Sequence, residues 1–528
     1  MKLARFRPAV KILGGFLLLA AGALRAAEPA ATPAPAPVAP AVQREACFKE
    51  VMQELDMNGD VLAYLNGRDL FQNVMTKVGE IAKALPADEP ETAKVQEYVK
   101  RADAFLGSSG LYAVRGMGFS VLPRADGQHT AKLFLAHDPA AASLPVWRIL
   151  GGAPGTLKSL EILPADTTFA QAETMDLSEA WGFVRSGISQ IGGPDALAAL
   201  DRQLAQAKAG SGVDAAALLQ ALGGEIFVSV QLSETTQSAI PLDQNNKLVF
   251  PQPAMLLGAS LRDAAKVTAM LDELAARNPE HPMFKKNVTG SGQTLYVLAN
   301  PVPAPFPLQP ALAVENGFLL IGSSPDALAA AFAVKAGGAG LTATPDFIKA
   351  FANMPRQINA LSYIHPRFAQ TVRDVQIQMA KQQTGGNPTA TVLLTKWIEG
   401  AGLTQSAGVR VNKPNGLFVT SVSPVSGRKM VGMVAVAPVA ILAGIALPNF
   451  VQARTTSQKN ACINNLRQID GAKEQWALAN DKDEGVVPNW QDLLPYLRKQ
   501  PVCAQGGKYS LNPLGKNPAC SIRGHVLP

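Results

Sequence analysis

Two apolar stretches differ from the mixed pattern of hydrophobic and polar positions in the rest of the chain. Residues 12–24 are apolar and follow a basic start, and small residues stand directly behind them. Residues 430–447 are apolar and uncharged, and a polar segment with a helical period continues to about residue 479. A membrane helix needs about 20 residues, so the first stretch is too short and the second is just long enough to be a candidate.

The first 27 residues have the order of a secretory signal, in which a basic start, an apolar stretch and small residues follow one another. An uncleaved N-terminal anchor is the alternative, and under both interpretations the rest of the chain is exported. Residues 28–42 are nearly all Ala and Pro, and proline removes a backbone donor and disfavours helix in the residue before it. We therefore expect a signal peptide over 1–27 and an extended linker over 28–42.

Three segments of the central region resemble one another. The segment near residue 55 and the one near residue 354 align Tyr64 with Tyr363 and Arg68 with Arg367, and a weaker copy begins near residue 163. Each copy has the pattern of a short strand, a turn and an amphipathic helix. Their uneven spacing favours duplicated domains over a solenoid with a fixed period.

The pattern between the copies predicts antiparallel hairpins. Asn316-Gly317 and Asn415-Gly416 each adjoin apolar runs, and Asn-Gly is typical of two-residue turns that need positive φ. Further strands are expected at 118–122, 132–136, 225–232 and 255–261, with helices beginning at Asp263 and at Ser324-Pro325.

Hairpins combined with helices predict an α+β fold of duplicated antiparallel-sheet-plus-helix domains. We place copies 1 and 2 in a domain over 43–235 and copy 3 in a domain over 236–425. The strand from Leu222 to Val230 and the three copies resemble exported bacterial proteins of unknown function that carry duplicated α+β domains. That resemblance implies no activity.

Composition narrows the function classes. The chain of 528 residues has a formal net charge of +7, and five of its basic residues lie in the first 27 positions, so the remainder is close to neutral. Nucleic-acid binders need clustered phosphate contacts, so we expect no nucleic-acid partner. Four cysteines in a chain of this length exclude a scaffold built on disulfides.

Sequence motifs for phosphate and metal binding are incomplete. Residues 151–159 resemble a phosphate-binding loop, but Leu157 stands where glycine must precede the lysine. Of the five histidines, only His129 and His137 are spaced closely, and the sequence gives them no third ligand. A plain turn and surface histidines are therefore expected.

A calcium loop is also incomplete. Asp56, Asn58 and Asp60 have the right spacing for its start, but Val61 replaces the required glycine and Gly67 the required glutamate. A nucleophile elbow and a Cys-x-x-Cys motif are missing from the sequence as well. We therefore predict no enzyme activity, catalytic residue, cofactor, metal or small-molecule ligand, although a catalytic site assembled from distant residues stays open.

The C-terminal hundred residues resemble a known family. The sequences Ile441–Arg454 and Asn460–Ala479, together with Cys503–His525, resemble type IV pilins and the pseudopilins of type II secretion. The resemblance implies a long helix that packs on a small C-terminal sheet or loop, and an apolar half that assembles in the inner membrane. The alignment puts Ser426-Gly427 at the processing site and Val431 where the family has glutamate, so we expect a degenerate module inside the chain.

This module is divided into an apolar, possibly transmembrane, helix over 428–450 and a pilin-like part over 451–528. Cys462, Leu466, Ile469, Lys473 and Trp476 recur at three and four positions, so the apolar members form one stripe and Lys473 would extend its amine to water. The run DKDEG (residues 481–485) is a solvated loop or, as in some pseudopilins, a calcium site.

The sequence allows two locations for the C-terminal module, the cytoplasm or the exported side of the membrane. If residues 430–447 span the membrane, the module lies in the cytoplasm and its thiols stay reduced. If they do not, the module is exported and Cys503 can pair with Cys520, because these residues close a short loop. Such a disulfide is worth about 2–4 kcal/mol, and two unpaired thiols are the alternative.

The sequence thus predicts a non-enzymatic protein of the periplasm or cell envelope with a pilin-like C-terminal module. Its role would be scaffolding or protein contact, with type II secretion or type IV pilus machinery as a possible partner and residues 430–447 at the membrane. The alternative is an exported enzyme with a dispersed active site in the duplicated domains.

Overall fold

The computed structural model describes residues 41–86, 91–241, 246–277, 280, 282–302, 308–383, 388–401, 403–428, 459–497, 499–503, 506–522 and 524–527. The chain divides into two compact units, Met1–Val431 and Gly432–Pro528. The predicted signal, all but the last two residues of the predicted linker, and the apolar stretch 430–447 lie outside the described residues. Within the described ranges, no helix combines the length and the apolar character that crossing a bilayer requires.

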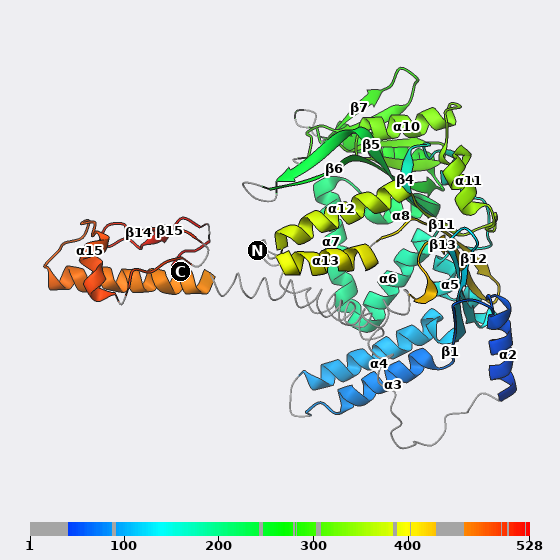
Figure 1. Ribbon diagram of the computed structural model, residues 1–528, viewed down its shortest axis with the longest axis horizontal. Helices are drawn as coiled ribbons and strands as arrows, with labels where there is room; N and C mark the ends of the chain where they lie inside the picture. Colours follow the sequence, from blue (N-terminus) through cyan, green and yellow to red (C-terminus); the bar gives the residue numbers. More distant parts are fainter. Residues whose placement is uncertain are drawn as a thin grey trace. The chain divides into compact units, whose positions relative to one another are not determined.

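The large unit is built on one antiparallel sheet of thirteen strands, and the α+β prediction is confirmed (Figure 1). The strand order is β1-β2-β3-β13-β12-β11-β4-β5-β6-β10-β9-β8-β7. The bounds are β1 (Val61–Asn66), β2 (Val114–Pro123), β3 (His129–His137), β4 (Thr167–Thr174), β5 (Leu222–Pro241), β6 (Lys247–Leu261), β7 (Phe284–Val288), β8 (Thr294–Leu298), β9 (Ala311–Glu315), β10 (Phe318–Gly322), β11 (Ala360–Ile364), β12 (Ser406–Lys413) and β13 (Gly416–Ser423).

The α-helices of this unit lie between strands in the sequence, except α2, which precedes β1. The α-helices are α2 (Ala41–Gln53), α3 (Leu70–Lys83), α4 (Thr92–Ser109), α5 (Pro145–Ile149), α6 (Leu177–Gly192), α7 (Pro194–Ser211), α8 (Ala215–Ala221), α9 (Ala264–Ala276), α10 (Pro325–Lys335), α11 (Pro345–Phe351), α12 (Pro366–Gln383) and α13 (Pro388–Ala401). The predicted helix starts are confirmed, because the Asp263 side chain caps α9 and Ser324 caps α10 with Pro325 in the first turn.

The three sequence copies correspond to one structural unit of a strand, a helical pair and two further strands, with α8 as an additional helix in the second copy. The copies are β1-α3-α4-β2-β3, β4-α6-α7-α8-β5-β6 and β11-α12-α13-β12-β13, and each helical pair can be followed in Figure 1. In each copy the first strand pairs antiparallel with the strand that follows the helices. Tyr64 and Tyr363 are both the fourth residue of their strand, so the sequence alignment marks equivalent positions.

The predicted division at residues 235 and 236 is corrected by this sheet. That boundary falls inside β5, and the chain up to Val431 forms one compact unit. The third copy lies between the other two, because β13 pairs with β3 and β11 pairs with β4. Because an edge strand of each copy pairs with a strand of a neighbouring copy, its backbone N–H and C=O groups are hydrogen-bonded instead of exposed.

Both faces of the sheet are buried at β8 and β10, close to the edge that ends with β7. Leu320 in β10 belongs to a core cluster covered by α10 and α11, whereas its neighbour Leu319 packs into the cluster beneath α8 and α9. Leu295 and Tyr296 in β8 divide in the same way. Successive side chains of a strand point to opposite faces, so these strands lie between two helical layers.

The two Asn-Gly predictions have different outcomes. Asn316 and Gly317 form the turn between β9 and β10 with φ of 52° and 77°, as predicted. Gly416, in contrast, is the first residue of β13 and pairs with Lys413, so the second turn is Pro414-Asn415. Glycine is needed there for packing, because a Cβ on Gly416 would lie 2.3 Å from the Leu135 carbonyl oxygen.

The C-terminal unit consists of a helix over 459–479, the short helix α15 (Trp490–Leu493) and a hairpin of β14 (Tyr509–Ser510) and β15 (Ala519–Cys520). The predicted stripe is confirmed, because its apolar members are all buried. Ile469 and Trp476 pack with Leu493, Leu511 and Leu514 into the core of this unit.

Lys473 differs from the prediction that its amine reaches water. The residue is only 2% exposed, and its Nζ donates to the carbonyl oxygens of Pro513 at 3.1 Å and Lys516 at 2.6 Å. Burial lowers the pKa of this lysine, against the opposing effect of Asp470 and Glu474. The amine therefore holds a C-terminal loop against the helix instead of extending from its surface.

Candidate functional site

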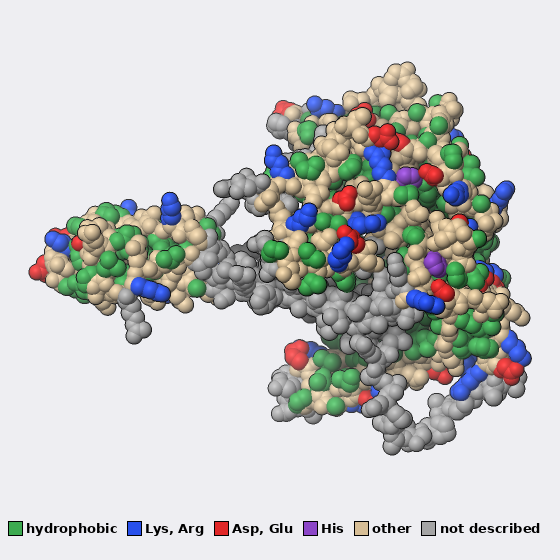
Figure 2. Space-filling model, in the orientation of Figure 1, with side chains coloured by type: hydrophobic (Ala, Val, Ile, Leu, Met, Phe, Trp, Pro, Cys, Tyr) green, Lys and Arg blue, Asp and Glu red, His purple; other side chains and the backbone are tan. Residues whose placement is uncertain are grey.

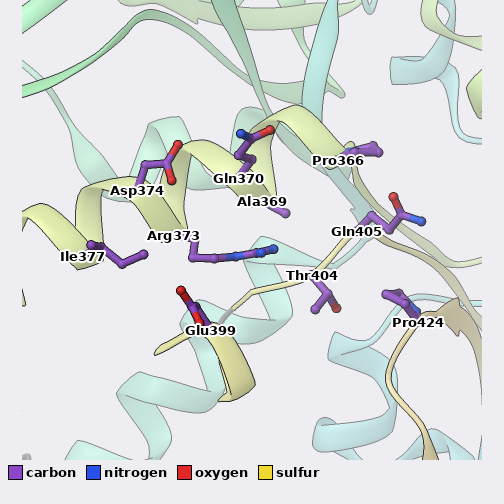
Figure 3. A pocket seen from close by; sticks show the side chains of 10 residues that line it. All are labelled: Pro366, Ala369, Gln370, Arg373, Asp374, Ile377, Glu399, Thr404, Gln405 and Pro424. Atoms are coloured by element: carbon purple, nitrogen blue, oxygen red, sulfur yellow. The ribbon is translucent and has the colours of Figure 1, made fainter. Parts of the chain in front are cut away.

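The first candidate is a cleft of about 750 Å³ in the large unit, beside α12 and α13. Figure 3 shows Arg373 extending from α12 along the cleft toward Thr404 and Gln405, with the Glu399 side chain of α13 on the opposite wall. Asp374 points away from Arg373 on the other side of α12. The Arg373 Nε is buried and has no hydrogen-bond partner.

This cleft is lined by polar groups, three of which are charged. Its charged lining residues are Arg373, Asp374 and Glu399, and a guanidinium stays protonated and cannot serve as a base. Figure 3 shows Asp374 and Glu399 on different sides of the arginine, so the two carboxylates do not form a converging pair. The arrangement offers a polar ligand one unpartnered guanidinium nitrogen and two separate carboxylates.

The loop that resembles a phosphate-binding loop is a structural clamp. The Asn412 side chain donates to the carbonyl oxygens of Leu150 and Gly151 at 3.0 and 2.9 Å, so carbonyls of this turn face protein donors. The backbone N–H groups of Lys158 and Ser159 donate to the Glu225 carboxylate at 3.0 and 2.8 Å. A carboxylate of the chain itself therefore occupies the place where an anion would bind.

The calcium-like segment and the paired histidines also have structural partners. Lys132 Nζ lies 2.7 Å from an Asp56 oxygen, and His129 Nε2 lies 3.9 Å from an Asp60 oxygen. His137 stacks on the ring of Trp147 with centroids 4.2 Å apart. The carboxylates of the segment thus face the Lys132 and His129 side chains of β3 instead of converging on one point.

The second candidate lies in the C-terminal unit, where four side chains of metal-binding type converge. Cys462 comes from the long helix, Cys503 and Cys520 from the segments around the small hairpin, and His525 from the end of the chain. Their ligand atoms all lie within 4.8 Å of one another. Among the described residues this is the one such group, and the predicted DKDEG run forms none.

Three of the four members of the cluster are buried, and Cys520 is half-buried. Cys462 is 0% exposed, and Cys503 and His525 are each 3% exposed. His525 Nδ1 lies 3.7 Å from Cys503 Sγ and 4.0 Å from Cys520 Sγ. Burial, together with the neighbouring thiols, raises the pKa of Cys462 to about 12, so without a cation this group is a protonated thiol.

The structure brings the two predicted disulfide residues, Cys503 and Cys520, into the same cluster. The four cysteines, all of which are described, carry no disulfide, and the proposed pairing stays a prediction. The sequence analysis missed Cys462 and His525 as members. The usable signal was a cysteine at an apolar-stripe position together with a histidine five residues after Cys520.

Acidic and basic side chains are interspersed over the face of the large unit shown in Figure 2. An extended surface of one sign, which phosphate-backbone recognition needs, does not occur among the described residues on that face. This distribution agrees with the nearly neutral charge of the chain beyond residue 27.

Comparisons with protein-family models, with curated proteins and with solved structures found no match for this chain.

Proposed function

We propose that this chain is a non-enzymatic exported protein of the cell envelope, in which a pilin-like C-terminal module is joined to a large scaffolding unit. The observation that carries the proposal is the arrangement of the C-terminal unit. One long helix packs its apolar stripe against a short hairpin and α15, which is the arrangement that the pilin resemblance implies. The sequence in front of this helix, residues 430–447, is apolar as in that family, although Val431 stands where the family has glutamate.

Protein contact is supported by the surface of the third repeat. On α13, Val392, Leu393 and Trp397 are 58%, 68% and 52% exposed. Leu393 and Trp397 are four residues apart, so they lie on one face of the helix. Adjacent large apolar side chains at a surface are typical of protein-interaction sites, and we propose envelope or secretion proteins as the partners.

Export is tested with reporter fusions in a Gram-negative host. Alkaline phosphatase, which folds only outside the cytoplasm, is fused after residue 428 and after residue 528, with and without residues 1–27. We expect phosphatase activity from the fusion after 428, and loss of it when residues 1–27 are deleted. An inactive fusion after 428 in the intact chain contradicts the proposal.

The fusion after residue 528 decides the topology of the module. Activity there means that the whole chain is exported, and inactivity with an active 428 fusion means that residues 430–447 span the membrane. Deleting residues 430–447 from the unfused chain should move it from the membrane fraction to the soluble fraction. A chain that stays soluble with this segment intact contradicts membrane attachment.

Contact is tested by placing a photo-crosslinking amino acid at Trp397 in living cells. We expect crosslinks to envelope or secretion proteins from this position. Gln203, an exposed polar position on α7, is the matched control and should give none. Equal crosslinking from both positions, or partners confined to the cytoplasm, contradicts the scaffolding role.

A further inference from the structure

The positions of the four converging side chains match the geometry of a tetrahedral metal site. Zinc binds cysteine sulfur at about 2.3 Å and histidine nitrogen at about 2.0–2.1 Å, which places two sulfurs about 3.8 Å apart and sulfur about 3.6 Å from nitrogen. The Nδ1 of His525 lies 3.7 Å from Cys503 Sγ and 4.0 Å from Cys520 Sγ. All pairwise separations in the cluster are at most 4.8 Å. Small shifts of the side chains would complete the site.

Polar groups around the cluster are directed at its sulfurs. The Tyr509 hydroxyl donates to Cys462 Sγ at 3.2 Å and itself accepts a hydrogen bond from Asn465 Nδ2 at 3.1 Å. The backbone N–H of Ile522 donates to Cys520 Sγ at 3.5 Å. Donors of this kind stabilise thiolates and orient them toward a metal ion.

Two glycines, Gly506 and Gly507, follow Cys503 in the loop beside the sulfurs, and a residue with a side chain would be disfavoured at each position. A Cβ on Gly507 would lie 2.6 Å from Cys520 Sγ and 3.3 Å from Cys503 Sγ. Gly506, directly before it, has a φ of 77°, which other residues rarely adopt. The chain therefore turns tightly around the two sulfurs and approaches them with bare backbone.

A disulfide accounts for only part of this cluster. Joining Cys503 to Cys520 would leave the buried thiol of Cys462 and the buried imidazole of His525 beside the bond. A divalent soft metal uses all four groups. Three thiolates and one imidazole are a donor set that zinc prefers, and four protein ligands leave no open position for catalysis.

We propose that Cys462, Cys503, Cys520 and His525 bind one zinc ion in a closed structural site that ties the C-terminal segments to the long helix. On binding, the three thiols release their protons to solvent as three Zn–S bonds form, and neutral His525 supplies the fourth ligand through Nδ1. The proposal does not depend on the compartment of the chain or on its partners.

The test uses the full chain, purified from the compartment where it accumulates in buffers free of chelator and reductant. Metal content is measured by mass spectrometry, and the cysteine state by digestion without reduction. We expect one zinc per chain, released by a mercurial thiol reagent, and no disulfide between Cys503 and Cys520. A Cys503–Cys520 disulfide without stoichiometric zinc overturns the proposal, as does another metal in place of zinc.

Variants separate ligation from folding. His525→Ala should lose stoichiometric zinc, whereas His525→Cys, which preserves a ligand, should retain it. Cys47→Ser, which alters a buried cysteine of the large unit, is the matched control and should keep one zinc per chain. Tyr509→Phe should weaken zinc binding roughly tenfold to a hundredfold through the lost hydrogen bond to Cys462.

Cobalt gives an independent readout of geometry. The reduced chain, stripped of metal and titrated with cobalt alone, should develop thiolate-to-cobalt charge-transfer absorption and the intense visible bands of tetrahedral cobalt. Retention of zinc by His525→Ala, or a reduced chain that binds neither zinc nor cobalt, overturns the assignment.

Discussion

Replacing Asn359 by alanine should loosen the clamp on the loop after α5. Asn359 is fully buried, and its Nδ2 donates to the carbonyl oxygen of Gly152 at 3.0 Å and to Thr174 Oγ1 at 3.2 Å. Its Oδ1 accepts the backbone N–H of Asn412 at 2.8 Å. One side chain thus connects the loop, β4 and β12, which belong to two different repeats.

The expected loss follows from these bonds. A net intramolecular hydrogen bond is worth about 1 kcal/mol, and a buried donor left without an acceptor costs about 1–3 kcal/mol more. Losing the bonds of Nδ2 and leaving the Asn412 N–H unsatisfied should therefore cost about 3 kcal/mol. Since 1.4 kcal/mol is a factor of ten, the local opening equilibrium should rise roughly a hundredfold.

Native-state hydrogen exchange measures this opening directly. The amides of Gly155 and Ile358 bond to each other's carbonyl oxygens across the loop at 3.0 and 2.8 Å, so both should be protected in the wild type. In Asn359→Ala they should exchange roughly a hundredfold faster. Asn287→Ala, at an exposed position on β7, is the control and should leave both rates unchanged. Unchanged rates in Asn359→Ala would refute the clamp.

Three further predictions concern other parts of the chain. Gly507→Ala should abolish stoichiometric zinc, because its Cβ would meet a ligand sulfur at 2.6 Å, while Gly471→Ala, which has open space on the helix, should leave the zinc content of the purified chain unchanged. Glu225→Gln should lower the free energy of unfolding by about 2 kcal/mol in urea titrations. The amide oxygen can still accept from one of the two N–H groups, whereas the amide NH2 would face the other, which loses its acceptor. An unchanged midpoint contradicts this. Hydrogen bonds from Lys286 and Tyr296 lower the pKa of Asp272 in the folded chain. The ionised Asp272 carboxylate therefore stabilises the fold at pH values above its unfolded pKa of about 3.9. That stabilisation is lost as the pH falls through the lower pKa of the folded state. Asp272→Asn should therefore flatten the decline of stability below about pH 4 in acid titrations, and a slope equal to the wild type would contradict the assignment.

Local signals in the sequence predicted local structure well. The turn at Asn316-Gly317 and the caps of α9 and α10 depend on a few adjacent residues, and all are present in the structure. The stripe from Cys462 to Trp476 was equally readable, because burial follows directly from the helical period.

Long-range pairing was not readable in the same way. The sheet places β11 beside β4 and β13 beside β3, so the third repeat lies between the first two although it comes last in the chain. This order depends on edge complementarity among strands nearly 200 residues apart or more, which no local pattern encodes. The predicted boundary at residue 235 failed for this reason, whereas the first and third repeats were recognised from the equivalent Tyr64 and Tyr363.

The cluster of Cys462, Cys503, Cys520 and His525 was not predicted from the sequence either, because Cys462 lies in a segment distant from the other three members. Cys503 and Cys520 are close in sequence, so a disulfide was the simplest expectation. A bond between them, however, would join two segments that both lie outside the long helix. Cys462 is the residue of the cluster that belongs to the helix, and a metal ion is the link that includes it.

This distinction matters because the described part of the C-terminal unit has one small apolar core. In the described part of the unit, residues 459–527, the strands are two residues long, and about 70 residues rarely build a sufficient core without a further crosslink. Lys473 fixes the loop at Pro513 and Lys516 to the helix eleven residues after Cys462, which is about 16 Å along its axis. A zinc ion at Cys462 would fix the same C-terminal segments at a second level. The helix would then be tied to them at two separated points, which a disulfide between Cys503 and Cys520 alone cannot achieve.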